Sequence, residues 1–154
     1  MNSPLPFVSV IVPAYKDQHY LEKAVESLLN QTYENYELLV VDDHSPTPLH
    51  LANHDALTLL RAPKNGGTAA ARNFGAAHAR GDLLLFADSD ELFAPEHIAV
   101  MVDTLQSSSA AIVAQHTKVY IRSDDSMDHI RRYSYWASNE FRLFLLGLTG
   151  CGLS

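Results

Sequence analysis

Apolar residues gather along the chain in short continuous runs. Five runs are rich in β-branched residues or leucine and have the length and composition of buried strands. They lie at 7–15, 36–43, 56–62, 82–88 and 110–121. The first strand is expected to stop at Pro13 and run into a loop, because proline cannot donate a ladder hydrogen bond.

Stretches with helical spacing of apolar residues separate these strands. They lie at 20–31, 65–81 and 94–106. Thr68 is expected to cap the second helix, Gly81 to end it, and Pro95 to occupy the first turn of the third. A short helix is also expected around His50 and His54, a pair that we interpret as structural because no third ligand accompanies it. Strands alternating with helices predict an α/β fold whose mainly parallel sheet is covered on both faces.

Length and composition describe a globular protein of about one domain. The chain has 154 residues, of which 47% are hydrophobic and 19% are charged. Its formal charge of −7 argues against nucleic-acid binding, because phosphate contacts need a clustered excess of Lys and Arg. An anionic ligand would therefore need local help from a metal ion or from backbone donors. Cys151 is the single cysteine, which excludes an intramolecular disulfide.

Neither a signal peptide nor a membrane-spanning pattern is evident in the sequence. The opening residues MNSPLPFVSV lack the basic and long apolar regions of a signal peptide. The apolar segment FRLFLLGLTG contains Arg142 and is too short to cross a bilayer. A cytoplasmic location is therefore expected, with peripheral association at the inner face of the membrane left open.

Acidic residues follow three of the predicted strands. Asp17 comes shortly after the first, Asp42 and Asp43 end the second, and Asp88 and Asp90 end the fourth. In an open parallel sheet, ligands bind in the crevice beyond the carboxyl ends of the strands, so the fold is expected to bring these acids together. An Asp-x-Asp pair can hold a divalent cation that also binds the phosphates of a nucleotide. Each motif alone is weak evidence, and their combination at strand ends favours a binding site.

Two long segments carry a family resemblance. VSVIVPAYKDQHYLEKAVESLLNQTYENYELLVVDDHSPT and NGGTAAARNFGAAHARGDLLLFADSDELFAPE resemble the nucleotide-binding half of family 2 glycosyltransferases. The resemblance covers about residues 7–105 and keeps the family's motif order, from the Val-Pro-x-Tyr loop to Asp-x-Asp. It implies a Rossmann-like GT-A fold. Residues 1–154 are then expected to form a single nucleotide-diphospho-sugar-binding domain that is incomplete at its C-terminus.

The same resemblance implies a set of site residues. The nucleotide-binding residues would be Pro13, Ala14, Tyr15, Asp17, Asp42, Asp43, Asn65, Gly67, Arg72, Asp88 and Ser89. The Tyr15 ring would lie against the base, Asp43 would accept a hydrogen bond from the base edge, and Asp17 and Asp42 would support the loop or the ribose. Asp88 and Asp90 would bind Mn²⁺ or Mg²⁺.

The implied reaction is transfer of a sugar, with inversion, from a nucleotide diphosphate to an acceptor hydroxyl. A UDP-sugar is the expected donor, and a glycan, a lipid or another hydroxyl compound is the expected acceptor. The family's catalytic base is an acid downstream of a Gly-rich strand similar to the final TGCGLS, so the base is expected beyond Ser154. The catalytic residue is therefore unassigned, and the 154-residue chain is expected to bind the donor without necessarily transferring the sugar.

Two alternatives stay open at this point. LLVVDDHS is similar to the acidic first strand of response-regulator receiver domains, with Asp88 as phosphoacceptor and Lys118 after a later strand. That interpretation leaves residues 7–35 and the Ala-Arg-Asn helix without a role. The other alternative is a donor-binding module that keeps the glycosyltransferase scaffold without catalysis.

Overall fold

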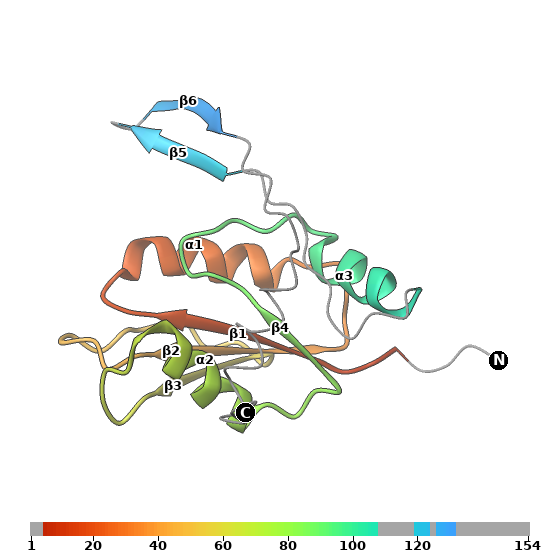
Figure 1. The fold of residues 1–154 in the computed structure, drawn as a ribbon, viewed down its shortest axis with the longest axis horizontal. Coiled ribbons are helices and arrows are strands. Elements are labelled where there is room, and N and C mark those ends of the chain that lie inside the picture. Colours follow the sequence, from red (N-terminus) through yellow and green to blue (C-terminus); the bar gives the residue numbers. More distant parts are fainter. Residues whose placement is uncertain (1–4, 108–118, 124–125, 132–154) are drawn as a thin grey trace, which may run out of the picture. The chain divides into compact units, whose positions relative to one another are not determined.

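The structure, a computed structural model, describes residues 5–107, 119–123 and 126–131. The chain divides into two compact units, Met1–Asp103 and Thr104–Ser154, and each is described by itself. The first unit contains a four-stranded sheet in the order β3-β2-β1-β4 (Figure 1). The strands are β1 (Val8–Ala14), β2 (Tyr36–Asp42), β3 (Leu57–Arg61) and β4 (Leu83–Phe86). All three pairings are parallel, as the alternation of strands and helices predicted.

Three helices cover the two faces of this sheet. They are α1 (Gln18–Leu29), α2 (Gly67–His78) and α3 (His97–Gln106). Side chains of α1 and α3, such as Leu21, Leu28 and Ile98, share one apolar cluster with Val10 of β1. The other cluster places Ala71 of α2 with apolar residues of β1 and β2. The apolar runs are buried on both faces because each face has its own helical layer (Figure 1).

The first strand does not stop at Pro13 but continues through it to Ala14. Pro13 is paired with Val41 of β2, whereas the pairing of β1 with β4 ends at Ile11 and Phe86. Along a strand, the backbone groups of successive residues point to alternate sides. The carbonyl of Ala14 points toward the β2 side, where it accepts a hydrogen bond from Asp43 N at 2.9 Å. The nitrogen of Pro13 therefore faces the side where no ladder remains, so its missing N–H costs no sheet hydrogen bond.

The predicted helix signals also need correction. Helix α2 begins at Gly67 with Gly66 as its N-cap, so Thr68 lies inside the helix and does not cap it. Gly81 follows the end of the helix, and a Cβ there would lie 2.5 Å from Ser9 N, so close strand approach explains this glycine. Pro95 precedes α3 in a turn.

The segment around the two histidines at 50 and 54 is not helical. His54 Nδ1 accepts a hydrogen bond from Ala56 N at 3.1 Å, and the backbone of His50 pairs with the side-chain amide of Gln18. His54 thus uses its ring in a local turn, whereas His50 ties the loop to the start of α1 through its backbone. Within the described residues, no helix has the length and apolar character needed to cross a bilayer.

The strand β4 lies at an edge of the sheet that the described residues form. Leu84 is 47% exposed, although the alternation of strands and helices predicted a sheet covered on both faces. The run expected at 110–121 lies partly outside the described residues. Its last part belongs to β5 (Val119–Ser123), which pairs antiparallel with β6 (Ser126–Arg131) in a separate two-stranded sheet.

Helix α2 packs closely on the sheet at Gly75. A Cβ added there would lie 2.6 Å from Cγ2 of Ile11 and 3.0 Å from Cγ2 of Val41. We expect Gly75→Ala to lower the free energy of unfolding by about 1–2 kcal/mol, because overpacking outweighs the better helix propensity of alanine. Urea unfolding measures the change. Ala77→Gly, at an exposed position of the same helix, measures the propensity term alone; a stabilised Gly75→Ala would show that the packing has room.

Candidate functional site

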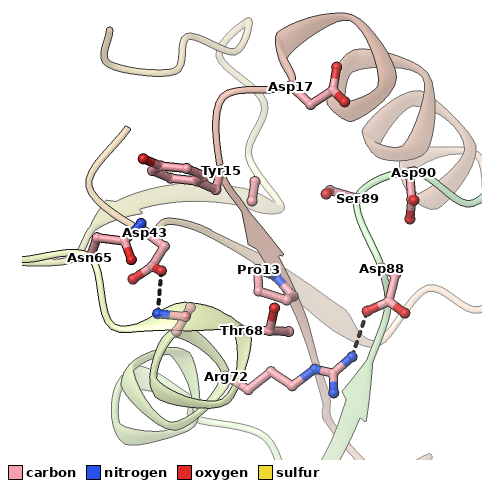
Figure 2. A pocket seen from close by; sticks show the side chains of 13 residues that line it. Pro13, Tyr15, Asp17, Asp43, Asn65, Thr68, Arg72, Asp88, Ser89 and Asp90 are labelled. Carbon is pink, nitrogen blue, oxygen red and sulfur yellow. Dashed lines mark hydrogen bonds and ion pairs between the residues drawn. The ribbon is translucent and has the colours of Figure 1, made fainter. Parts of the chain in front are cut away.

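A cavity of about 550 Å³ opens beyond the carboxyl ends of β1, β2 and β4, beside the start of α2. Its lining residues are Pro13, Ala14, Tyr15, Asp17, Asp43, Asn65, Gly67, Thr68, Ala71, Arg72, Asp88, Ser89 and Asp90. The structure thus brings together all of the predicted site residues except Asp42. Figure 2 shows their side chains: Tyr15, Asp43 and Asn65 lie on one side, Asp88, Ser89 and Asp90 lie on the other, and Arg72 reaches from α2 to Asp88.

Asp43 joins the end of β2 to the start of α2. Its carboxylate accepts hydrogen bonds from Gly66 N at 3.0 Å and from Gly67 N at 2.7 Å (Figure 2). The first N–H groups of a helix lack acceptors within the helix, and the Asp43 carboxylate, which follows β2, accepts from two N–H groups at this helix start. Gly67 has φ of +80°, which an L side chain adopts with strain, and nothing lies within 4 Å of the place a Cβ would take. The turn therefore holds Asp43 in place and leaves room in front of it.

Asp42 points elsewhere and supports the loop after β2. Its carboxylate accepts from Ser45 N at 2.8 Å and from Leu49 N at 3.4 Å, and it forms an ion pair with Arg61. Burial raises the pKa of Asp42, but these hydrogen bonds and the arginine outweigh burial and leave the pKa below its usual value. Ser45 in turn accepts from Lys16 N at 2.9 Å, so the loops after β1 and β2 are tied together.

Two non-glycine residues with positive φ flank the cavity. Lys16 has φ of 68° and follows Tyr15, and His44 has φ of 57° and follows Asp43. Such conformations carry backbone strain that surrounding contacts must maintain. Here His44 Nδ1 lies 3.0 Å from the carbonyl oxygen of Ala62, and the Ser45 hydroxyl holds Lys16 N. The two strained residues directly follow Tyr15 and Asp43, which are predicted to contact a nucleotide base.

Tyr15 presents an aromatic surface at the mouth of the cavity. The residue is 41% exposed, and the ammonium of Lys16 lies 4.8 Å from the centre of its ring. In Figure 2 the ring lies on the same wall as Asp43 and Asn65. A planar heterocycle can stack on such a ring while a carboxylate contacts its edge. The wall therefore suits a nucleotide base.

The acids after β4 form the opposite wall. Asp88 Oδ1 lies 2.5 Å from Nη2 of Arg72, which projects from α2 (Figure 2). Glu91 does not line the cavity, but its partial burial and then the charges of Asp88 and Asp90 raise its pKa above the usual value. This crowding of negative charge suits a cation.

The donor groups fit a hard divalent ion such as Mn²⁺ or Mg²⁺. The described part of the chain contains no cluster of three or more His, Cys, Asp or Glu side chains that could hold a metal. Mg²⁺-type sites, however, commonly use one or two carboxylates together with water and substrate phosphates. Asp88 and Asp90 supply two carboxylates at a cavity wall, so a metal there would need oxygen ligands from a bound molecule.

Sequence reasoning missed two lining residues and two supporting ones. Thr68 was expected to be a cap, and nothing in the sequence separates the buried Ala71 from its alanine neighbours. Ser45 and Arg61, which hold the loop beneath Tyr15 and Asp43, act through tertiary contacts. The acids at strand ends indicated Asp17, Asp43, Asp88 and Asp90, and the family resemblance indicated the other predicted lining residues.

Comparison with known proteins identifies the family. Residues 9–152 match the model of Glycosyl transferase family 2. The chain belongs to this family. An uncharacterized glycosyltransferase of Haemophilus influenzae is 38% identical over 104 residues, which cover 64% of this chain and 41% of that protein. Glycosyltransferase GlyG of Streptococcus pneumoniae is 29% identical over 140 residues, which cover 87% of this chain and 45% of that protein.

Solved structures of glycosyltransferases share the fold of this chain. The mannosyltransferase PcManGT from Pyrobaculum calidifontis, in complex with GDP-Man and Mn²⁺, has a TM-score of 0.55 and 28% identity, covering 63% of this chain and 31% of its own. TarS of S. aureus in complex with UDP-GlcNAc has a TM-score of 0.55 and 28% identity, covering 65% and 32%. The sheet and its helices have the GT-A fold, as predicted, and the receiver-domain alternative has no support. This chain spans less than half the length of each of these four proteins.

Proposed function

We propose that this chain forms the nucleotide-sugar-binding part of a glycosyltransferase that transfers a sugar, with inversion, to an acceptor hydroxyl. The observation that carries the proposal is the cavity at the strand ends, where an aromatic ring and a fixed carboxylate face an Asp-x-Asp pair. Two solved structures similar to this chain contain GDP-Man and Mn²⁺ in one case and UDP-GlcNAc in the other. A nucleotide diphosphate sugar, with a UDP-sugar as first choice, is therefore the proposed donor.

The wall built by β1 and β2 would bind the nucleoside. The base would stack on Tyr15 and donate an N–H to Asp43, whose carboxylate is held by the start of α2. Pro13, Ala14 and Asn65 complete the wall, and Gly67 leaves space for the ligand to approach the backbone. An ionised carboxylate only accepts hydrogen bonds, so bases that present a ring N–H, such as uracil or guanine, should bind best.

The wall after β4 would hold the diphosphate. The cavity lining carries four aspartates and one arginine, so a diphosphate would be repelled unless a cation accompanied it. Asp88 and Asp90 would hold Mn²⁺ or Mg²⁺, with Ser89 between them toward the nucleotide. The bound ion would stabilise the negative charge of the departing diphosphate.

Transfer requires an acceptor and a base in addition to this site. The acceptor oxygen attacks the anomeric carbon opposite the diphosphate, the bond from that carbon to the diphosphate oxygen breaks, and a base takes the hydroxyl proton. Asp43 caps α2 and Asp88 pairs with Arg72, so we propose neither of these two carboxylates as the base, which stays unassigned. We propose a glycan, lipid or other hydroxyl compound as acceptor and a cytoplasmic site of action, at the inner membrane face where the acceptor is a lipid.

Thermal unfolding with UDP tests the donor site. At about 100 times its dissociation constant, UDP with Mn²⁺ should stabilise the protein by about 2.7 kcal/mol and raise the melting temperature by about 5–10 °C. Asp90→Ala should lose most of this gain, because the diphosphate then lacks its cation. Glu34→Ala removes an exposed acid outside the cavity and should keep it.

Two results would contradict the proposal. Equal stabilisation by UDP with Mn²⁺ and with a chelator would exclude the metal role of Asp90, and no stabilisation by UDP or GDP would exclude the nucleotide site. A protein that binds UDP but releases none from a UDP-sugar in the presence of acceptors would fit the binding module without catalysis.

A further inference from the structure

Among the described residues that line the cavity, Arg72 is the single basic one. It projects from α2, and its Nη2 lies 2.5 Å from Oδ1 of Asp88 on the opposite wall (Figure 2). The charge that could bind an anionic ligand is therefore already used by a protein carboxylate. The same carboxylate is one of the two proposed to bind the metal ion.

The ion pair leaves the arginine incompletely satisfied. Its Nε is buried and has no hydrogen-bond partner within the described residues. A buried donor without a partner costs free energy that a different position of the guanidinium could recover. The guanidinium carbon lies 5.9 Å from the centre of the Phe86 ring, a flat apolar surface that the side chain can follow as it moves. In the paired position one donor of Arg72 therefore stays unsatisfied.

The charge of the cavity also favours a change in the ion-pair partner of Arg72. The lining aspartates are Asp17, Asp43, Asp88 and Asp90, so the cavity attracts a cation and repels an anion. A divalent ion that binds Asp88 takes the acceptor that Arg72 uses. The released guanidinium then has five N–H donors for phosphate oxygens. Its planar shape lets two of these donors bind two oxygens of one phosphate.

We propose that Arg72 exchanges partners during donor binding: it pairs with Asp88 in the metal-free protein, and a divalent ion displaces it toward the diphosphate. The exchange rests on the proposed function, since it concerns the same cation and the same donor. Binding of the metal then strengthens binding of the nucleotide, because the metal takes Asp88 away from Arg72. Binding of the nucleotide strengthens binding of the metal, because the diphosphate takes Arg72 away from Asp88. Such coupling is reciprocal in the two affinities.

Opposite effects of one substitution test the exchange. Arg72→Ala should bind Mn²⁺ alone about three- to fivefold more tightly than the wild type, since a partly exposed ion pair of this kind competes weakly. The same variant should bind UDP in the presence of Mn²⁺ about tenfold or more weakly, because a charge-assisted hydrogen bond to phosphate is lost. Calorimetry measures both affinities. Lys23→Ala, which removes an exposed positive charge outside the cavity, controls for net charge and should change neither.

A matched pair of acid substitutions tests the exchange from the other side. Asp88→Asn and Asp90→Asn each remove one negative charge from the same wall, but Asp88 alone of the two pairs with Arg72. With a chelator present, Asp88→Asn should bind UDP at least about threefold more tightly than Asp90→Asn, because it releases the arginine as well as reducing repulsion. Equal metal-free affinities in the two variants would overturn the exchange.

The outcomes separate this inference from the proposed function. If wild-type protein binds UDP with Mn²⁺ but Arg72→Ala binds Mn²⁺ no more tightly, the exchange is wrong and the donor site stands. If the wild type binds no nucleotide, the donor site is wrong, and the exchange as stated falls with it. Thermal unfolding of each variant without ligand confirms that it is folded before binding is compared.

Discussion

Asp43→Ala is expected to lower the free energy of unfolding by about 2–3 kcal/mol and to weaken UDP binding about tenfold or more. The carboxylate accepts from Gly66 N and Gly67 N, so its removal leaves two helix N–H groups without their partners. The same atoms face the cavity, where they would accept from the base. Urea unfolding and calorimetry with UDP and Mn²⁺ measure the two effects.

Asp17→Ala is the matched control for this prediction. Asp17 also lines the cavity and occupies the N-cap of α1, but its side chain makes no capping hydrogen bond. Its removal should therefore cost much less stability while removing the same charge. Asp43→Asn, which keeps one carbonyl oxygen for the helix, should be intermediate. An Asp43→Ala protein as stable as Asp17→Ala would show that the distant cap contributes little.

The sheet could be predicted because its apolar runs carry strong local signals. Val10 and Ile11 are both fully buried although they point to opposite faces, which is the mark of a strand covered on both sides. Local signals failed where tertiary contacts decide. Pro13 lies in a strand because β4 ends before reaching it, and α2 is capped by Asp43 from another strand instead of by Thr68.

The location of the site could be predicted more easily than the roles of its residues. Strand ends gather at one edge of a parallel sheet, so the acids had to meet there. Adjacent residues of a strand point to opposite sides, however, and sequence alone does not say which of Asp42 and Asp43 faces the ligand. The structure places Asp43 at the cavity and Asp42 in the loop with Ser45 and Arg61. The pairing of Arg72 of α2 with Asp88, which follows β4, likewise depends on the fold.

A second buried carboxylate lies on β2, outside the cavity lining. Glu37 is 4% exposed and accepts from the Ser9 hydroxyl at 2.7 Å and from Arg80 N at 2.8 Å. The Arg80 guanidinium completes the network with bonds of 2.9 and 2.6 Å, and Gly81 N donates to Ser9 Oγ. The network joins the adjacent strands β1 and β2 to the segment that leads into β4. Burial raises the pKa of Glu37, but the hydrogen bonds from Ser9 and Arg80 outweigh it and leave the pKa below its usual value.

Glu37→Ala is expected to lower the free energy of unfolding by about 3 kcal/mol, because it leaves Ser9 and Arg80 N without their acceptor. Arg80→Ala should cost about 1 kcal/mol, since Arg80 is 74% exposed and its backbone N–H is retained.

The folded pKa of Glu37 lies below the unfolded one, so its contribution is complete above the unfolded pKa and is lost as pH falls from about 5 through the folded value. Glu37→Gln should therefore show a shallower loss of stability with acid in urea titrations between about pH 6 and pH 3. The remaining slope belongs in part to Asp42, whose pKa is lowered in the same direction, and an unchanged slope in Glu37→Gln would show that Glu37 titrates alike in the folded and unfolded chain.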